Sequence, residues 1–442
     1  MTDAEAVAAW LDDHREALSE FVVSFGNVLS PRGSEGEASR FFAEQLEEWG
    51  LESRLQPVVG DRANVIATVR GNRSQDDGRD LVFNGHIDTA HGDPDEDGAV
   101  LADQPRAYRE CWRDGPFLKG DGVVNDKGPL SATVFAALAL AETGVDLAGD
   151  LHVTGSVGEI SGTTVGEFDD PERYAGSGLG TRHLVENGVT GDYALVAECT
   201  GFSIARMEAG VAWFAVELEG SSTYHPLLGR ADDGNDEDER QSRQSRSDVV
   251  YDLAATIEAL EEWGERYRHE HTREYEHGTV RPVASVGAVR AGKPYSPAAA
   301  PGSATIYLDV RLPPGETPGF ARREIETVLE DCGVEATVEP YLFRQGHVAD
   351  PDAVAGLTDP LETAHESVCG SAPTPPEPHV TSMWRDSNVF NEVGIPSVNY
   401  GPSRAPEAFE EASLTDAIRV DDLVAAAQIY ALTALAVCGS DE

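Results

Sequence analysis

Residues that can bind a metal ion follow short apolar runs at several points in this chain. His86 and Asp88 come after one such run, and Glu159 and Glu198 each come after another. The glycine-rich turn at 120–128, Gly-Asp-Gly-Val-Val-Asn-Asp-Lys-Gly, carries acids at its tip. In a His-x-Asp pair the imidazole commonly binds a metal while a carboxylate fixes the ring. A single pair is more typical of a structural hydrogen bond, but four polar strand ends in one sheet favour a functional site.

The elements that must position these residues alternate between strands and helices in the first 200 residues. We predict strands at 64–71, 81–84, 151–157 and 193–197, and helices at 35–49 and 129–142. This alternation is typical of a parallel or mixed sheet that is covered on both faces. Polar residues follow three of these strands at their carboxyl ends, where open α/β sheets place their sites.

The pattern changes near Gly210. Strands are predicted at 211–219, 284–289, 304–312 and 335–341, and helices at 249–267 and 318–330. Two helices on one small antiparallel sheet describe an inserted α+β module. The α/β pattern then resumes with a helix at 352–368, a strand at 397–400 and a helix at 420–437. We therefore expect an α/β catalytic domain in two parts, 1–209 and 344–442, with an α+β domain at 210–343 between them.

Composition excludes several classes of partner. Asp and Glu number 79 against 33 Lys and Arg, so the formal net charge is −46. Such a charge repels nucleic acids and anionic membranes. No apolar run approaches the roughly 20 residues of a membrane-spanning helix, and the N-terminus has no basic segment leading into an apolar one, as a signal peptide would. Five scattered cysteines indicate free thiols in a reducing cytoplasm.

The balance of basic residues points to a salty habitat. Only three of the 33 basic residues are lysines. Acid enrichment with so little lysine is typical of proteins that stay soluble in molar salt, where a Debye length of about 3 Å screens self-repulsion. We therefore expect a halophilic cytoplasmic protein, with an ordinary acidic mesophilic protein as the alternative.

Six segments carry a resemblance to a known family. They are LVFNGHIDT (81–89), GDGVVNDKG (120–128), GEISG (158–162), YALVAE (193–198), IYLDVRLPPG (306–315) and RDSNVFNEVGIPSVNYGPS (385–403). They resemble the zinc-dependent amidohydrolases and exopeptidases that include acetylornithine deacetylase, succinyl-diaminopimelate desuccinylase and aminoacylase. The resemblance implies a mixed-sheet, metallopeptidase-like catalytic domain with a ferredoxin-like lid that usually forms a dimer. It also implies two zinc-like ions bridged by an Asp, with a Glu as general base in amide hydrolysis.

The resemblance assigns roles to individual residues. His86 matches the histidine ligand of one metal, Asp88 its supporting carboxylate and Glu198 its acidic ligand. Glu159 matches the general base.

Two further residues match the lid of the family. Arg311 matches an arginine that grips a substrate carboxylate in some members. His225 is the one candidate for the lid histidine, and it lies slightly out of register. The expected substrate is therefore a small N-acyl amino acid or short peptide, cleaved at an amide next to a carboxylate.

Three positions depart from the family pattern. Asn125 stands where the bridging Asp is expected, and Asp126 is one place late. The family has a second Glu directly after the general base, and this chain has Ile160 there. The family also has a histidine near the C-terminus, expected at about Ala412, and no histidine lies between Ser403 and Glu442. Because the last two residues bind the same metal in the family, this chain is expected to have lost one metal site.

The expected cofactor is one divalent ion, with a second left open. Zn²⁺ is the default, and Co²⁺ or Mn²⁺ are alternatives. His86 and Glu198 would hold the ion with either Asn125 or Asp126, and His379 could approach the site. The competing hypothesis is a non-catalytic ligand-binding or regulatory paralogue of the same fold.

Overall fold

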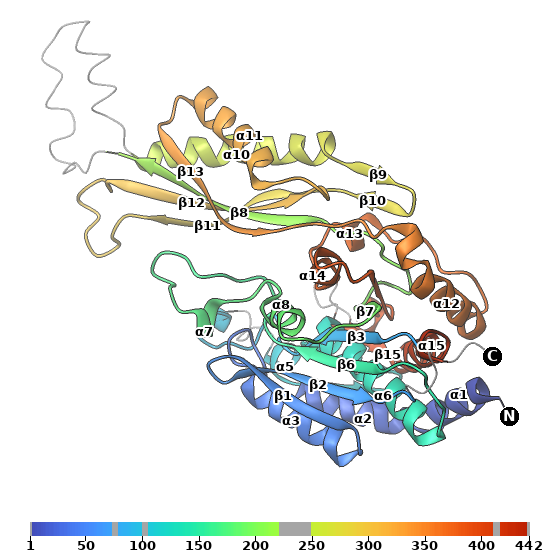
Figure 1. Cartoon of the computed structure of the whole chain (residues 1–442). Coiled ribbons are helices and arrows are strands. Elements are labelled where there is room, and N and C mark those ends of the chain that lie inside the picture. Colours follow the sequence, from blue (N-terminus) through green and yellow to red (C-terminus); the bar gives the residue numbers. More distant parts are fainter. Residues whose placement is uncertain (1, 73–77, 100–104, 221–248, 410–415, 440–442) are drawn as a thin grey trace, which may run out of the picture. The chain divides into compact units, whose positions relative to one another are not determined.

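The described residues form two units (Figure 1). The computed structural model describes the chain except for residues 1, 73–77, 100–104, 221–248, 410–415 and 440–442. Unit 1 comprises Met1–Arg206, Val348–Pro376 and Arg385–Glu442, and unit 2 comprises Met207–His347 and Glu377–Trp384. The expected boundaries at 209/210 and 343/344 lie beside the observed divisions at 206/207 and 347/348.

One short segment belongs to a different unit from the one we expected. Residues 377–384 were assigned by sequence to the second part of the catalytic domain, but they are part of unit 2. The reason is packing: α13 (Pro378–Thr381) lies against β10 (Gly278–Val280), and the Thr381 hydroxyl donates to the Thr279 carbonyl at 2.6 Å.

Unit 1 is built around a six-stranded mixed sheet. Its strands, in spatial order, are β1 (Glu52–Val59), β2 (Arg62–Val69), β6 (Leu151–Ser156), β3 (Leu81–His86), β7 (Tyr193–Ala197) and β14 (Ser397–Tyr400). The β3 strand pairs in parallel with β6 and β7, and β7 pairs in parallel with β14, whereas β1 and β2 are antiparallel. The carboxyl ends of four strands therefore meet at one edge of the sheet.

Helices cover both faces of this sheet. One face carries α1 (Asp3–Asp13), α2 (Arg15–Gly26), α3 (Gly36–Glu48), α6 (Gly128–Thr143), α12 (Pro351–Cys369) and α15 (Val420–Cys438), which share the main apolar core. The other face carries α8 (Leu179–Glu186) and α14 (Ser387–Glu392), over smaller apolar clusters.

The rest of unit 1 consists of short elements beside the sheet. They are α5 (Pro105–Arg109), β4 (Trp112–Asp114), β5 (Phe117–Lys119), η1 (Val123–Lys127), α7 (Pro171–Tyr174), η3 (Pro406–Ala408) and β15 (Ala417–Arg419). The strands β15, β5 and β4 form a small antiparallel sheet.

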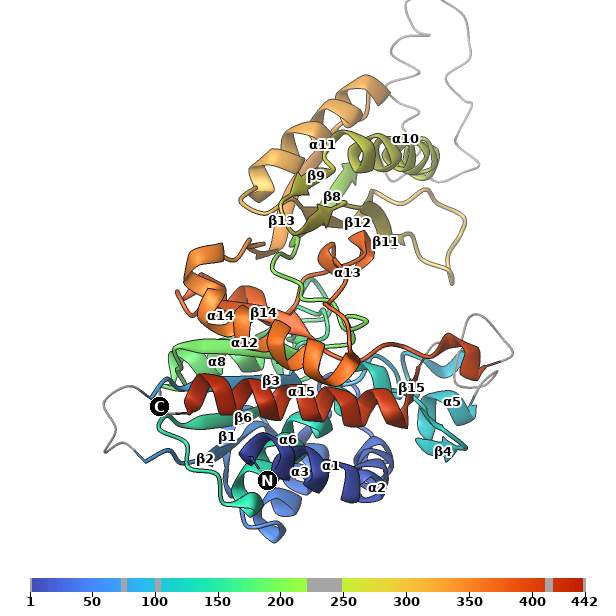
Figure 2. The same ribbon diagram turned by 90° about the vertical axis from the view of Figure 1, so that its right-hand side faces the viewer.

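The helix α15 is the one described helix whose length and apolarity would allow it to cross a membrane, which differs from the expectation that the chain has no such apolar run. In the structure, 61% of its apolar window is buried. It packs against α6, α12 and α1 (Figure 2). Its apolar residues therefore fill the core of unit 1.

Unit 2 is an α+β module with a four-stranded antiparallel sheet. Its elements run β8 (Gly210–Glu219), α10 (Val249–Glu270), β9 (Arg273–Tyr275), β10, β11 (Ala284–Ala291), β12 (Ser303–Leu312), α11 (Pro318–Cys332) and β13 (Ala336–Arg344). The sheet order is β11-β12-β8-β13, and α10 and α11 share an apolar core with it. This βαββαβ arrangement is ferredoxin-like. The predicted α/β fold with an inserted α+β module is confirmed.

Candidate metal and catalytic site

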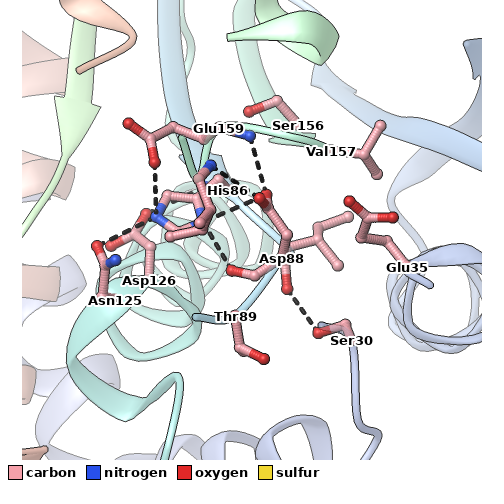
Figure 3. A network of polar contacts seen from close by, with 12 residues as sticks. Ser30, Glu35, His86, Asp88, Thr89, Asn125, Asp126, Ser156, Val157 and Glu159 are labelled. Carbon is pink, nitrogen blue, oxygen red and sulfur yellow. Dashed lines mark hydrogen bonds and ion pairs between the residues drawn. The ribbon is translucent and has the colours of Figure 1, made fainter. Parts of the chain in front are cut away.

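Six of the predicted residues come together at the carboxyl edge of the unit 1 sheet. Figure 3 labels five of them, namely His86, Asp88, Asn125, Asp126 and Glu159. His86 ends β3, and Glu198 directly follows β7. Glu159 lies in the turn after β6, and Asn125 and Asp126 lie in η1. The parallel order of the strands produces this meeting, because β3 is hydrogen-bonded to both β6 and β7.

The imidazole of His86 is held from one side and faces oxygen atoms on the other. Its Nδ1 lies 2.9 Å from the Asp88 carbonyl oxygen and 3.5 Å from Asp88 Oδ1. Its Nε2 lies 3.1 Å from Asn125 Oδ1, 3.7 Å from Glu159 Oε2 and 4.0 Å from Glu198 Oε1. Burial opposes the charged ring, yet the hydrogen bond to Asp88 and the charges of Glu159 and Asp88 raise the pKa of His86 well above its usual value.

Asp88 connects the histidine to the turn that carries the candidate base. Its Oδ1 accepts the backbone N–H of Glu159 at 3.1 Å, and its Oδ2 accepts that of Ile160 at 2.8 Å. Burial alone would raise the pKa of Asp88, but these amides and His86 hold it below its usual value. A fully buried carboxylate thus stays charged and fixes two elements at once.

The two neighbouring residues of η1 point in different directions. The Asn125 carboxamide faces Nε2 of His86, whereas Asp126 Oδ2 accepts the backbone N–H of His86 at 3.1 Å. Gly85 leaves room for this contact, since a Cβ there would stand 2.6 Å from Asp126 Oδ2. Of the two alternatives that the sequence left open, Asn125 is the one beside the ring nitrogen, and Asp126 braces β3.

Glu159 has the environment of a general base. It is 8% exposed, and burial raises its pKa well above the usual value. The charge of His86 opposes this rise, while the charges of Asp386 and Glu198 add to it. A carboxyl group whose pKa is raised toward neutrality accepts a proton from water more readily than an ordinary one.

Sequence reasoning missed two buried residues of this site. Nε of Arg385 lies 3.3 Å from Oε2 of Glu198. Asp386 Oδ2 accepts hydrogen bonds from side chains on three other elements, namely Thr181 at 2.6 Å, Ser156 at 3.0 Å and Asn84 at 3.1 Å. Both residues lie in the segment 385–403, which is one of the six that resemble the family. This match is the sequence signal from which a role for them could have been predicted.

Residues 82–436 match the model of peptidase family M20/M25/M40. The chain belongs to this family. The resemblance to metal-dependent amidohydrolases and exopeptidases is therefore confirmed. Among curated relatives, the N-formyl-4-amino-5-aminomethyl-2-methylpyrimidine deformylase of Halalkalibacterium halodurans is 27% identical over 232 residues, which are 50% of this chain and 47% of that protein. The chain spans about half the length of the curated relatives that it matches first.

Solved structures of peptidase family members share the fold over nearly the whole chain. Human carnosine dipeptidase 1 has a TM-score of 0.68 at 16% identity and covers 99% of both chains. The dipeptidase Dug1p of Saccharomyces cerevisiae has a TM-score of 0.70 at 12% identity and covers 100% of both. The two likenesses extend through both units.

Other predicted residues of this M20/M25/M40 chain lie elsewhere. His225 and the Ala412 position fall outside the described residues. Arg311 is in unit 2, where its guanidinium pairs with Asp309 at 3.1 Å. It lines a hollow of about 400 Å³ within that unit, together with His379.

The donors in unit 1 are of the types that bind divalent ions in metal-dependent hydrolases. Oδ1 of Asn125 and Oε1 of Glu198 both face Nε2 of His86, and Asp88 orients the ring as supporting carboxylates do at metal sites. An imidazole, a carboxylate and an amide leave a fourth position open for water. Across the described part of the chain, no group of three or more His, Cys, Asp or Glu side chains gathers as a metal site, and the donor nearest to Nε2 of His86 is the Asn125 amide oxygen.

Proposed function

We propose that this protein is a metal-dependent hydrolase that cleaves an N-acyl or peptide amide next to a carboxylate. One observation carries the proposal: a buried carboxylate, Glu159, lies 3.7 Å from the ring nitrogen that also faces Asn125 and Glu198. A base beside a set of metal donors is the minimum that hydrolysis of an amide requires. Deformylase and dipeptidase activities named among its relatives support the same class of reaction.

Each residue has a distinct task in this proposal. Glu159 takes a proton from the attacking water and later delivers it to the leaving nitrogen. Asp88 keeps His86 in the orientation that leaves Nε2 free for the ion. The ion, when bound, polarises the substrate carbonyl and acidifies water. Arg311 reads the substrate carboxylate through its planar guanidinium.

The proposed cofactor is a single ion, Zn²⁺ by default with Co²⁺ or Mn²⁺ as alternatives. His86, Glu198 and Asn125 would hold it. The apolar Ile160 stands in the turn after β6, where the family pattern has the second acid, and this supports one ion rather than two.

Replacement of the candidate base tests the proposal. The Glu159→Gln variant is expected to lose at least about 100-fold in turnover of N-acyl amino acids or dipeptides, with an unchanged metal content by elemental analysis. The exposed Glu47→Gln serves as the matched control. Near wild-type turnover by Glu159→Gln would remove its role. A wild-type protein that binds these compounds without cleaving any of them would favour the non-catalytic paralogue.

We also propose that the protein forms a homodimer through unit 2. The edge strand β11 has exposed residues along most of its length, and the backbone of an edge strand can pair with a second copy. Light scattering of the purified chain tests this: a mass near twice 47.3 kDa is expected, and a monomer over the accessible concentration range would contradict it.

The net charge of −46 supports a halophilic, cytoplasmic protein. Salt screens repulsion among the carboxylates, so the unfolding midpoint is expected to rise as KCl is raised from about 0.1 M to above about 1 M. A midpoint that falls or stays constant over this range would contradict halophily.

A further inference from the structure

The carboxylate of Glu198 lies between two nitrogen-bearing side chains, one facing each of its oxygens. Its Oε1 faces Nε2 of His86 at 4.0 Å, and its Oε2 lies 3.3 Å from Nε of Arg385. The side chains of Arg385 and Glu198 are 5% and 6% exposed. Because little water reaches this pair, the charge of the guanidinium is screened weakly.

The backbone around Arg385 is anchored where the arginine meets Glu198. The next residue, Asp386, accepts three side-chain hydrogen bonds from β3, β6 and α8. The Arg385 carbonyl accepts the N–H of Asn388 at 3.1 Å, at the start of α14. The backbone that carries the guanidinium is thus fixed by hydrogen bonds, and this holds the side chain of Arg385 beside Glu198.

We propose that Arg385 is a positioning residue that leaves Glu198 only one oxygen for the metal and supplies a permanent positive charge beside it. The inference rests on the proposed function, since it concerns the same site. The guanidinium stays protonated at any working pH and holds no ligand of its own. It therefore offsets part of the negative charge of the buried acid cluster. A second metal ion could do the same only if further side chains supplied ligand atoms for it.

The surrounding charges explain why such a residue is useful. Five buried carboxyl groups lie within this cluster, on Asp88, Asp126, Glu159, Glu198 and Asp386. A permanent positive charge beside Glu198 stabilises the ionised form of these buried groups. Ile160 offers no oxygen to a second ion, and a fixed guanidinium on the far oxygen of Glu198 both offsets the remaining charge and repels another cation.

Titration with Co²⁺ tests the inference without any measurement of activity. In the folded wild-type chain, Glu198 acts through one oxygen, so a low-coordinate Co²⁺ spectrum with intense visible bands is expected. In Arg385→Gln the freed Oε2 joins the ion, the bands weaken, and Co²⁺ binds at least about tenfold more tightly because a nearby like charge is gone. Arg385→Lys keeps the charge and should stay within about threefold of wild-type affinity.

Two further variants keep the test decisive. Arg385→Met removes the charge with an apolar chain, in case a buried glutamine prevents folding; circular dichroism of each variant checks this. Arg182→Gln removes an arginine of the same unit that pairs with Glu392, away from the donors, and should leave Co²⁺ binding unchanged.

The outcomes separate this inference from the proposed function. Equal Co²⁺ affinity and spectrum in wild type and in the folded neutral variants would overturn the role of Arg385, even if the enzyme hydrolyses amides. Co²⁺ binding by the neutral variants but not by wild type would support the repulsion by Arg385 while contradicting a resident metal in the native protein. Absence of binding in all of them would overturn both.

Discussion

The backbone amide of Glu159 donates to Oδ1 of Asp88 at 3.1 Å, so the carboxylate that orients His86 also fixes the turn that carries the candidate base. The second oxygen of Asp88 accepts the N–H of Ile160 at 2.8 Å. The separation between the ring and Glu159 is therefore set by one side chain rather than by two independent loops.

Asp88→Asn should weaken metal binding and turnover together. The amide offers only one acceptor oxygen to two backbone N–H groups, and it loses the charge that orients His86. We expect metal affinity to fall by about 10- to 100-fold and the free energy of unfolding by about 1–3 kcal/mol. Equilibrium dialysis and urea unfolding measure the two effects. Asp146→Asn, at an exposed position, is the control, and equal metal affinity in the two variants would contradict the role of Asp88.

Gly85→Ala should weaken the hydrogen bond that the backbone N–H of His86 donates to Asp126. The new Cβ would stand 2.6 Å from Asp126 Oδ2 and 3.0 Å from Leu130 Cβ, so the carboxyl group must move off the His86 amide. We expect a loss of about 1–3 kcal/mol in the free energy of unfolding. Gly287→Ala, in strand β11, would make only an ordinary contact, at 3.8 Å from the Tyr307 carbonyl oxygen, and should change it by less than about 1 kcal/mol. Similar losses at both positions would show that the crowding is not specific to Gly85.

Arg62→Met should destabilise unit 1 far more than loss of a surface ion pair. Arg62 Nη2 donates to Glu35 Oε1 at 2.7 Å, and the two side chains are 1% and 0% exposed. Removal of the arginine leaves a buried carboxyl group unpaired, which costs about 3–5 kcal/mol. Glu52→Gln, which removes the exposed partner of Arg70, should cost about 0–1 kcal/mol. Chemical unfolding of both variants tests the contrast, and equal losses would refute it.

Asp416→Asn should change how stability depends on pH. Burial and the nearby charge of Asp121 raise the pKa of Asp416 to about 6, against the opposing charges of Arg404 and His91. Between the unfolded pKa near 3.8 and this value, the folded chain binds the extra proton, so Asp416 lowers stability as pH rises through that window.

The variant should therefore gain stability relative to wild type as pH rises from about 4 to about 6, by at most about 3 kcal/mol, with no further gain above that range. Urea unfolding of both proteins across the window measures the difference. A difference that is constant with pH would contradict the raised pKa.

The strand ends of the site could be predicted from the sequence because each apolar run that indicates a buried strand is followed by a residue that can bind a metal or accept a proton. Apolar runs that lead into His86, Glu159 and Glu198 require only that the strands be parallel neighbours. The α/β organisation of unit 1 could be predicted from the alternation of strand-like and helix-like segments. The change in this pattern near Gly210 also predicts unit 2 as a separate α+β insertion.

The direction of Asn125 and Asp126 could not be predicted, because adjacent residues in a turn separate according to backbone angles that no pattern encodes. Asn125 has φ −137° and ψ 85°, outside the helical range of its neighbours. Arg385 escaped prediction for another reason: its partner, Glu198, is distant in sequence, and only the order of strands in the sheet brings them together.

The packing of α15 has a consequence for the order in which the chain acquires structure during synthesis. The four strands of the main unit 2 sheet and the two helices on it all lie between Gly210 and Arg344, so they can pack together before the rest of the chain leaves the ribosome, and only the short segment 377–384 joins unit 2 later. Unit 1 is completed later, because β14 and α15 follow most of unit 2 in the chain and the side of α6 that packs against α15 stays exposed until α15 is made. A nascent chain stalled before Val420 therefore exposes apolar surface that chaperones bind, and C-terminal truncations should aggregate rather than yield a smaller active enzyme.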